Sequence, residues 1–164
     1  IYPALERGVI DAAEFVGPYD DEKLGLNRIA RFYYAPGFWE PSSRGGFVVN
    51  LRQWEALPAH YRHAIEVACS EVELDMPARY DALNPPALRR LIAGGAQLRA
   101  WPRDILLAAW RETNALYEDT ASRNANFKKV WDSYRPWRSE QYQWFRVAEN
   151  AYDNFAFPMA AQQG

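Results

Sequence analysis

The chain has 164 residues, of which 49% are apolar and 24% are charged, and these proportions are ordinary for a single globular domain. Its 19 basic and 21 acidic side chains nearly balance, so the sequence indicates no basic face and no nucleic-acid partner. The apolar runs are short and interrupted by charges, which argues against a membrane-spanning helix. Aromatic residues make up 15%, a high share that favours a ligand cleft or a large protein–protein surface.

The first fifty residues predict short strands and loops of a hinge or cleft. Gly8 stops a helix over residues 2–7, and the apolar residues 9–13 predict a buried strand that ends at Glu14. The remaining predicted elements here are a short helix at 20–29 and β-rich runs at 32–34 and 47–49. Because these strands are too short for an independent sheet, we expect them to complete one begun elsewhere.

Helices dominate residues 51–135, which are predicted to be segments of a helical lobe. Leu57-Pro58 begins a long helix that Pro77 is expected to kink. Asn84, which precedes two prolines, is typical of an N-cap, so a new short helix is predicted there, with its end at Gly94-Gly95. The predicted core face of the long helix comprises Tyr61, Ile65, Ala68, Cys69, Val72 and Met76.

Cys69 is the single cysteine, so it cannot form an internal disulfide. Its place on the apolar face of a helix favours a buried structural thiol over a catalytic nucleophile. Low cysteine content is compatible with the cytosol and with the bacterial periplasm, and it does not decide between them.

Beyond residue 96, the sequence predicts a small strand at 97–100, helices beginning near 101 and 127, and a break at Arg135-Pro136. A C-terminal aromatic helix is then predicted over residues 136–158. The chain has no initiator Met and opens on helical sequence. We therefore expect residues 1–164 to be one piece of a longer protein.

Glu14 is the leading candidate for a functional side chain. It has apolar neighbours on both sides, and a partly buried carboxylate is unfavourable unless it is paired or holds a cation. A carboxylate with nearby backbone carbonyls suits Na⁺ or Ca²⁺, whereas a salt bridge to an arginine is the structural alternative. Phe15 could supply a carbonyl ligand and an apolar wall, or it could be an ordinary core residue.

Trp39 lies in a second aromatic and acidic loop, Phe38-Trp39-Glu40, where ligand contact and simple anchoring of the loop both stay open. His60 and His63 lie three residues apart on a helix, but their polar surroundings favour a solvated face over a metal site. Asp20-Asp21-Glu22 lacks the alternating spacing of a calcium loop and is better explained by helix N-capping. The chain has no GxGxxG, P-loop, GxSxG, CxxC or HExxH motif.

Several separated motifs, in the same order, resemble one family over nearly the whole chain. They are residues 1–25, Tyr33-Tyr34-Ala35-Pro36-Gly37-Phe38-Trp39-Glu40, Asn84-Pro85 with Leu88-Arg89-Arg90-Leu91, Gly94-Gly95, Trp101-Pro102-Arg103-Asp104 and Trp144-Phe145-Arg146-Val147-Ala148-Glu149-Asn150. In these motifs the chain resembles the extracytoplasmic solute-binding subunits of tripartite ATP-independent periplasmic (TRAP) transporters, the DctP family, and within it the branch that binds 2-oxo acids.

The resemblance implies a helix-rich α/β fold. The chain would be the C-terminal half of a two-lobed, type II-like periplasmic clamp, with long helices and short strands that complete sheets begun upstream. The missing N-terminal half would carry an arginine that pairs with the substrate carboxylate and a glutamine that completes a metal site. Some members of this branch dimerise by exchanging a C-terminal helix, so a homodimer through residues 136–158 is also implied.

The resemblance also implies a role for each site residue. Glu14 would help hold a cation, Na⁺ or Ca²⁺, that bridges to the carboxylate and keto oxygens of the substrate. The next residue is usually Trp in this branch and is Phe15 here, which keeps the backbone oxygen and the ring but lacks an indole donor. The predicted metal ligands are thus Glu14 and Phe15, and the predicted ligand-binding residues are Glu14, Phe15 and Trp39.

The implied function is transport without catalysis. A periplasmic subunit, made with a signal peptide upstream, would bind a small 2-oxo monocarboxylate such as pyruvate and present it to membrane permease subunits for Na⁺-driven uptake. A dicarboxylate or a lactate-type hydroxy acid is the alternative ligand. Two other hypotheses are a metal-assisted enzyme using Glu14 with Glu40, for which no nucleophile–base pair is evident, and a helical dimerisation scaffold.

Overall fold

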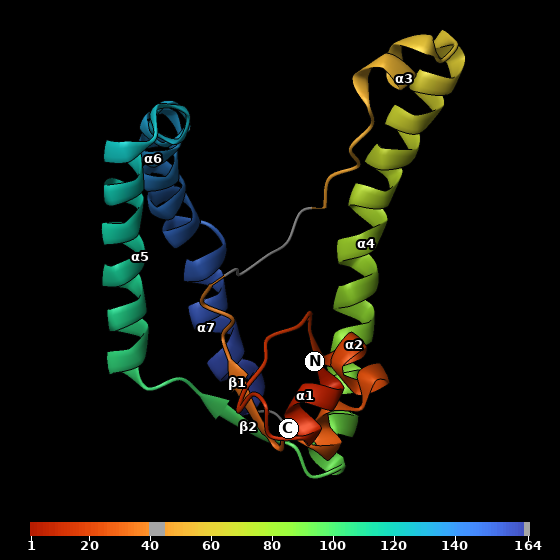
Figure 1. The fold of residues 1–164 in the computed structure, drawn as a ribbon. Coiled ribbons are helices and arrows are strands. Elements are labelled where there is room, and N and C mark those ends of the chain that lie inside the picture. The colour runs from red at the N-terminus through yellow and green to blue at the C-terminus, as the bar shows by residue number, and fades with distance from the viewer. Residues whose placement is uncertain (40–44, 163–164) are drawn as a thin grey trace. The chain divides into compact units, whose positions relative to one another are not determined.

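The computed structural model describes residues 1–39 and 45–162, and it groups the chain into two compact units, Ile1–Pro102 and Arg103–Gly164. Figure 1 shows the order of the elements along the chain. Among the described residues, no helix combines the length and the apolar character that crossing a membrane requires.

The first unit consists of short N-terminal helices, one long helix and a two-stranded sheet. Its elements are α1 (Tyr2–Glu6), α2 (Pro18–Leu24), the 3₁₀ turn η1 (Leu26–Arg28), β1 (Phe32–Ala35), α3 (Leu51–Ala56), α4 (Ala59–Ala93) and β2 (Gln97–Ala100). β1 pairs in parallel with β2, so that Phe32 lies opposite Gln97 and Ala35 opposite Ala100.

The small core of this unit lies where α2 packs against the C-terminal part of α4 (Figure 1). Ala87 and Leu91 of α4 are buried there, and Ala96 is buried just before β2. Ala87 and Leu91 are four residues apart, close to one helical turn, and the side chain of Asn84, three residues before Ala87, contacts α2. The packing therefore joins α2 firmly to α4.

The second unit is helical, with α5 (Arg103–Arg123), α6 (Ala125–Val147) and α7 (Glu149–Ala161). Asn124 caps α6, because its side chain accepts a hydrogen bond of 3.0 Å from the backbone N–H of Phe127. Trp131 is the large buried side chain among the described residues here, with 5% of its surface exposed, and its indole donates to Glu118 of α5. α5 and α6 thus pack as an antiparallel pair about Trp131.

Several local predictions are confirmed. α1 ends just before Gly8, whose φ of 66° is a left-handed conformation that favours glycine. Strands form at Phe32–Ala35 and Gln97–Ala100, and α4 ends at Gly94-Gly95, where Gly95 has a φ of 99°. Each of these signals depends on a few neighbouring residues, which is why the sequence reveals them.

The strands predicted at residues 9–13 and 47–49 are wrong. Neither segment has regular structure, and all their residues except the half-buried Val49 are exposed, with Val48 showing 91% of its surface. β1 and β2 pair only with each other among the described residues, so no neighbouring strand offers these segments a hydrogen-bonding ladder. Apolar sequence alone therefore did not produce a strand.

The break predicted at Asn84 is also wrong, because α4 runs without interruption from Ala59 to Ala93 through Pro77, Pro85 and Pro86. Asn84 does act as a cap, but for a different helix: its side chain accepts the backbone N–H of Tyr19 in α2. Each proline lacks the N–H group that would donate a helical hydrogen bond. Burial of the α4 residues that follow the prolines favours a continuous helix and outweighs the loss of these hydrogen bonds.

The helix predicted over residues 136–158 is divided differently. α6 continues through Pro136 to Val147, and the break comes at Ala148, where ψ is −105°. The aromatic residues of this region therefore belong to two helices, α6 and α7.

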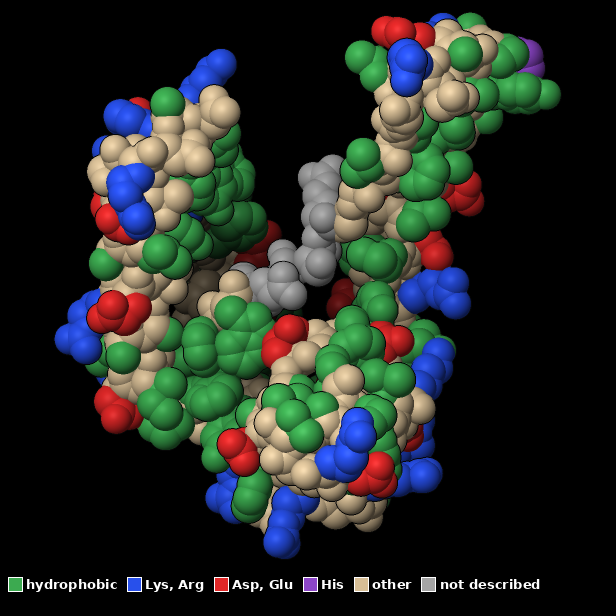
Figure 2. All heavy atoms as spheres, in the orientation of Figure 1, with side chains coloured by type: hydrophobic (Ala, Val, Ile, Leu, Met, Phe, Trp, Pro, Cys, Tyr) green, Lys and Arg blue, Asp and Glu red, His purple; other side chains and the backbone are tan. Residues whose placement is uncertain are grey.

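The predicted core face of α4 is a further correction. Cys69 is exposed, and so are Tyr61, Val72 and Met76 on the same face. Figure 2 shows hydrophobic side chains along the visible surface of α4.

Leu51 and Trp54 of α3 share an open hollow with Ile65 and Cys69 of α4, and Ile65 is half-buried there. The rest of the predicted core face stays largely exposed, so the helical pattern marks an apolar face that this chain covers only in part.

Candidate functional site

Glu14 and Phe15 lie in a segment without regular structure, residues 9–17, that connects α1 to α2. Its start is tied to α1, because the N–H of Val9 donates a hydrogen bond of 2.8 Å to the carbonyl of Ala4. Its end is Gly17, which precedes α2. Both ends of the segment are thus attached to helices.

The Glu14 side chain is exposed, which corrects the prediction of a partly buried carboxylate. It has no hydrogen bond or ion pair within the part of the chain that the structure describes, so the alternative of a salt bridge finds no partner there. Phe15 shows 40% of its surface and is not an ordinary core residue in this chain. An exposed carboxylate and a partly exposed aromatic residue therefore lie side by side on one short segment.

Asp21 lies in the first turn of α2 and is buried, with 7% of its surface exposed. The hydroxyl of Tyr33, on β1, donates a hydrogen bond of 2.6 Å to Oδ2 of Asp21. Burial raises the pKa of the Asp21 carboxyl, an effect that the Tyr33 hydrogen bond and the backbone amides of Val16 and Gly17 oppose. Burial and the neighbouring carboxylate likewise raise the pKa of Tyr33.

Three further polar contacts hold α2 against α4. The backbone N–H of Tyr19 donates to Oδ1 of Asn84 at 3.1 Å, and the hydroxyl of Tyr80 donates to Asp20 at 2.8 Å. Arg90 donates two hydrogen bonds of 2.7 Å to Glu22, and this pairing lowers the pKa of the Glu22 carboxyl. α2, and with it the end of the segment that carries Glu14, is therefore fixed by side chains from two other elements. Asp20 and Asp21 lie in the first turn of α2, but the predicted N-capping by the acidic run is wrong, because the N-cap is Gly17 and the capping side chain is that of Asn84.

Trp39 belongs to an aromatic cluster around Trp101. The Trp101 ring stacks on Tyr34 with a centroid distance of 4.5 Å, and the rings of Phe38 and Trp39 meet it edge-on at 5.4 and 6.1 Å. The backbone N–H of Trp101 donates to the carbonyl of Ala35 at 3.2 Å, just past the last paired residues of β1 and β2. The cluster thus lies at the carboxyl ends of two parallel strands, where α/β proteins commonly bind ligands.

The sequence analysis does not predict the place of Trp101 at the centre of this cluster; it assigns Trp101 to the start of a helix and to a family motif. The available signal was its position directly after a predicted strand, since the ends of parallel strands share one edge of a sheet. Phe15 makes no ring contact with this cluster within the described residues, so the structure does not join it to Trp39. Glu40, which the enzyme hypothesis combines with Glu14, lies outside the described residues.

Other candidate sites do not combine with these residues. His60 and His63 are both exposed on α4, and His63 lies 3.8 Å from Glu66, so the prediction of a solvated helix face is confirmed. Within residues 1–39 and 45–162, no three acidic, histidine or cysteine side chains form a potential metal site. A cation at Glu14 would therefore need further oxygen ligands besides acidic side chains of this part of the chain, such as carbonyls, water or ligand oxygens.

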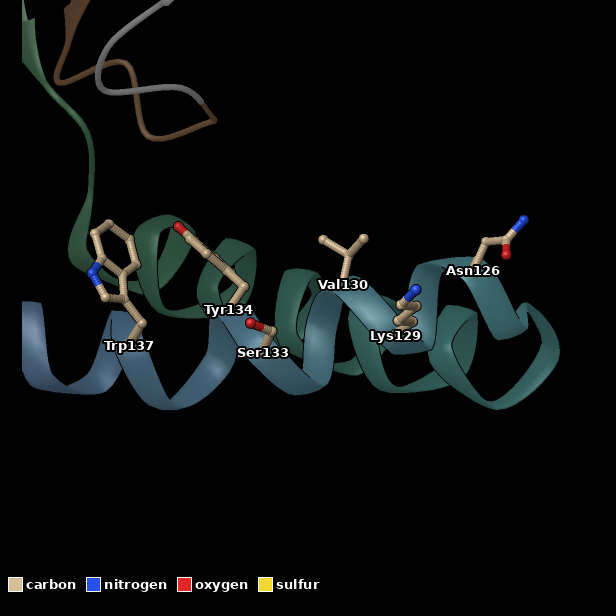
Figure 3. Close-up of a pocket in the computed structure, with 6 residues that line it drawn as sticks. All are labelled: Asn126, Lys129, Val130, Ser133, Tyr134 and Trp137. Atoms are coloured by element: carbon tan, nitrogen blue, oxygen red, sulfur yellow. The ribbon is translucent and has the colours of Figure 1, made fainter.

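An open groove runs along one face of α6, in the second unit (Figure 3). It is lined by Asn126, Lys129, Val130, Ser133, Tyr134 and Trp137. All of these side chains come from a single helix and project to the same side. The groove contains none of the predicted site residues and lacks the converging polar groups of a small-molecule site.

Comparison with known proteins agrees with the predicted family. Residues 1–124 match the model of the family described as bacterial extracellular solute-binding protein, family 7 (DctP). Over 156 residues the chain is 48% identical to a monocarboxylate 2-oxoacid-binding periplasmic protein of Nostoc sp. PCC 7120. That alignment covers 95% of this chain and 43% of the Nostoc protein.

Two solved structures resemble the chain closely. A TRAP transporter solute-binding protein of Bordetella bronchiseptica, crystallised as a dimer with calcium and picolinate, is 45% identical, with a TM-score of 0.93 over 99% of this chain and 48% of its own. A TRAP periplasmic solute-binding protein of Pseudoalteromonas atlantica, with bound sodium and pyruvate, is 29% identical, with a TM-score of 0.85 over 93% of this chain and 46% of its own.

The chain spans about half the length of the relatives that it matches. Its helix-rich fold is correspondingly that of about half of a TRAP solute-binding protein, as the sequence predicted. The family model covers residues 1–124, which is most of the chain, and the Nostoc and Bordetella relatives are described as a 2-oxoacid-binding periplasmic protein and a TRAP transporter solute-binding protein. The chain therefore belongs to the bacterial extracellular solute-binding protein family 7, the DctP family.

Proposed function

We propose that this chain is part of a periplasmic TRAP solute-binding protein that binds a small 2-oxo monocarboxylate such as pyruvate together with Na⁺ or Ca²⁺. The observation that carries the proposal is the exposed Glu14, which has no hydrogen bond or ion pair with any described residue and adjoins Phe15 on a segment held at both ends. The Nostoc relative binds monocarboxylate 2-oxo acids, and the two solved relatives hold a cation with a small carboxylate ligand.

The cation explains why an acidic residue is present in a site for an anion. Glu14 alone would repel a carboxylate ligand, whereas Glu14 and the Phe15 carbonyl are hard oxygen ligands that suit Na⁺ or Ca²⁺. The bound cation offsets the negative charge and leaves positions for ligand oxygens. Two protein ligands are too few for either ion, so the remaining oxygens come from the ligand and from other parts of the protein.

A 2-oxo acid fits this arrangement because its carboxylate and keto oxygens lie on adjacent carbons and can bind one cation together. The Phe15 ring and the Trp39 cluster supply apolar surface for the rest of a small ligand. Closure of the protein around the pair would remove water and strengthen the attraction between cation and anion. This mechanism involves binding and release, and no bond in the ligand is broken.

A lactate-type hydroxy acid is the second candidate ligand, since its hydroxyl oxygen has the same position as the keto oxygen. A dicarboxylate is the third, and it would need a further cationic group for its second carboxylate. Affinities for pyruvate, lactate and succinate, measured side by side, separate these candidates. An enzyme is not proposed, and formation of any product from pyruvate would contradict this part of the proposal.

The partners follow from the transporter assignment. The loaded protein would present its ligand to membrane permease subunits, with a Na⁺ gradient driving uptake from the periplasm. The aromatic helices α6 and α7 are proposed to mediate a homodimer, since Trp144, Tyr152 and Phe155 are exposed on them. The Bordetella relative is a dimer, which supports this part of the proposal. A monomer in sedimentation equilibrium at micromolar concentration would contradict it.

Calorimetric titration of the intact protein with pyruvate tests the proposal. The titration is run in Na⁺, in Ca²⁺ and in a buffer without either ion. We expect cation-dependent binding that Glu14→Gln weakens by at least about ten-fold, because a charged ligand is lost. Glu71→Gln removes an exposed carboxylate from α4 and is the matched control. Equal affinities for Glu14→Gln and the wild type would reject Glu14 as a cation ligand.

A further inference from the structure

The side chain of Asn84, on α4, contacts the chain on both sides of Pro18. Its Oδ1 accepts a hydrogen bond of 3.1 Å from the backbone N–H of Tyr19. The same side chain lies against Gly17, because a Cβ added at Gly17 would lie 3.6 Å from Oδ1 and 3.7 Å from Nδ2 of Asn84. One side chain of α4 therefore reaches the residue at which the segment that carries Glu14 ends.

The middle of this segment has little else to hold it. Its start is tied to α1, and at its end the carbonyl of Gly17 accepts a backbone N–H of α2 at 2.9 Å. Among the described residues, no backbone–backbone hydrogen bond involves residues 11–16, and Glu14 has no hydrogen bond or ion pair of its own. Gly17 lies three residues beyond Glu14, a stretch that spans at most about 11 Å. A shift of Gly17 therefore changes the place of Glu14.

The other polar contacts between α4 and α2 lie further along α2. Tyr80 donates to Asp20 at 2.8 Å, and Arg90 donates to Glu22 at 2.7 Å. The three atoms nearest to the Cβ position of Gly17 all belong to Asn84. Asn84 itself is half-buried, and the fully buried Ala87 lies about one turn further along α4. The contact with Gly17 is thus made from a packed part of the long helix.

We propose that Asn84 is a positioning residue, which holds the end of the segment so that Glu14 and Phe15 lie where the cation binds. This inference rests on the proposed function. Asn84 does not contact the cation or the ligand, and it acts through Gly17 and Tyr19. Such pre-organisation favours binding because less freedom is lost when the cation arrives.

The chain offers a matched pair of substitutions on α4. Asn84→Ala removes the hydrogen bond to Tyr19, and Tyr80→Phe removes the hydrogen bond to Asp20, the next residue of α2. Each substitution deletes one side-chain hydrogen bond between the same two helices, but only the first also removes the contact with Gly17. Asn84→Asp keeps the size of the side chain and the oxygen that accepts from Tyr19, so it is the conservative variant.

The experiment measures pyruvate affinity of the intact protein in Na⁺ and in Ca²⁺ for the wild type and these variants, with urea unfolding for each. We expect Asn84→Ala to weaken binding by about five-fold in Na⁺ and about ten-fold in Ca²⁺, and Tyr80→Phe by less than about two-fold in either. The loss is larger in Ca²⁺ because a displaced Glu14 carboxylate loses more attraction to a divalent ion. Asn84→Asp should restore most of the affinity.

Gly17→Val tests the same contact from the side of the segment. A side chain longer than Cβ would run into the Asn84 amide, so this variant should also weaken binding by about five-fold. Because both substitutions act on one contact, combining it with Asn84→Ala should weaken binding by less than the product of the two separate losses. A loss equal to that product would overturn the inference that the Gly17 contact carries the effect.

A merely structural role of Asn84 predicts a different result. Loss of stability alone would lower the urea midpoint and weaken binding equally in the two cations. Equal losses in Na⁺ and Ca²⁺, equal effects of Asn84→Ala and Tyr80→Phe, or normal binding by Asn84→Ala would overturn the positioning role while the proposed function stands. No pyruvate binding by the wild type in either cation would overturn the proposed function, and the positioning role with it.

Discussion

The side-chain oxygen of Asn84, in the C-terminal third of α4, accepts a hydrogen bond of 3.1 Å from the backbone N–H of Tyr19, at the start of α2. The first N–H groups of a helix lack partners within it, and Gly17, the N-cap of α2, has no side chain to satisfy them. A residue distant in sequence therefore provides the cap. This contact couples the position of α2, and of the segment before it, to the long helix.

Asn84→Ala should destabilise the protein by about 1 kcal/mol, since loss of a capping side chain has an effect of this size. Urea unfolding of the intact protein measures the change. Asn126→Ala is a suitable control, because Asn126 lies on the surface of α6 and lines only the open groove there. A free energy of unfolding for Asn84→Ala that matches the control would show that the cap contributes nothing.

Asp21 should make stability depend on pH in the opposite sense to an ordinary surface carboxylate. Its pKa is raised in the folded state, mainly by burial, so between the unfolded and folded pKa values the folded state binds more protons. The stabilisation is complete below the unfolded pKa and is lost as pH rises through the folded pKa. The wild type should therefore lose stability relative to Asp21→Asn as pH rises from about 3.5, just below the ordinary pKa of aspartate, to neutrality.

Urea midpoints of the wild type and Asp21→Asn across this pH range measure the difference in stability. The groups that titrate in both proteins affect both midpoints alike, so their contribution cancels in the difference. A difference that stays constant with pH would show that the Asp21 pKa is unshifted.

Arg138 should stabilise the helix pair of the second unit through its aromatic surroundings. Its guanidinium lies 4.9 Å from the ring centroid of Trp131 and 5.8 Å from those of Trp110 and Tyr142, and it donates to Asn114 at 3.0 Å. Arg138→Gln should lower the free energy of unfolding by about 1–3 kcal/mol, from lost cation–π contacts and a hydrogen bond.

Arg138→Lys should restore only part of this loss, because lysine lacks the planar group that stacks on rings. Chemical denaturation of each variant measures the effect, with Arg111→Gln as the control on the exposed surface of α5. Full recovery by lysine would show that charge alone, and not the planar guanidinium, accounts for the stabilisation.

Trp39→Ala should weaken pyruvate binding by about ten-fold if the Trp39 ring forms part of the apolar wall of the site. Calorimetry on the intact protein checks this value. Trp144→Ala removes an equally large ring that is 60% exposed on α6, and it should leave the affinity unchanged. Normal affinity in Trp39→Ala would assign Trp39 to anchoring its loop against Trp101 rather than to ligand contact.

The sequence by itself determined the local features of this protein and its family. Gly8 and Gly94-Gly95 end helices because glycine readily adopts the left-handed backbone conformation that stops a helix, an effect confined to one turn. The strand at Phe32–Ala35 follows from four consecutive β-favouring or small residues. The ordered motifs from residue 1 to Asn150 were sufficient to identify the DctP family. They also indicated Glu14 and Phe15, whose roles remain predictions.

Only the tertiary structure decided which of these local preferences prevail. Asn84 carries the signal of an N-cap, but its partner is the N–H of Tyr19, and α4 continues through the prolines because its next turns are buried. In sequence, Asp21 resembles any acidic residue in the first turn of a helix. In the structure it is buried, it accepts a hydrogen bond from the Tyr33 hydroxyl, and its pKa is raised. The physical reason is that a cap, a strand partner or a buried charge is stabilised by groups far away in the chain, whose position no local pattern records.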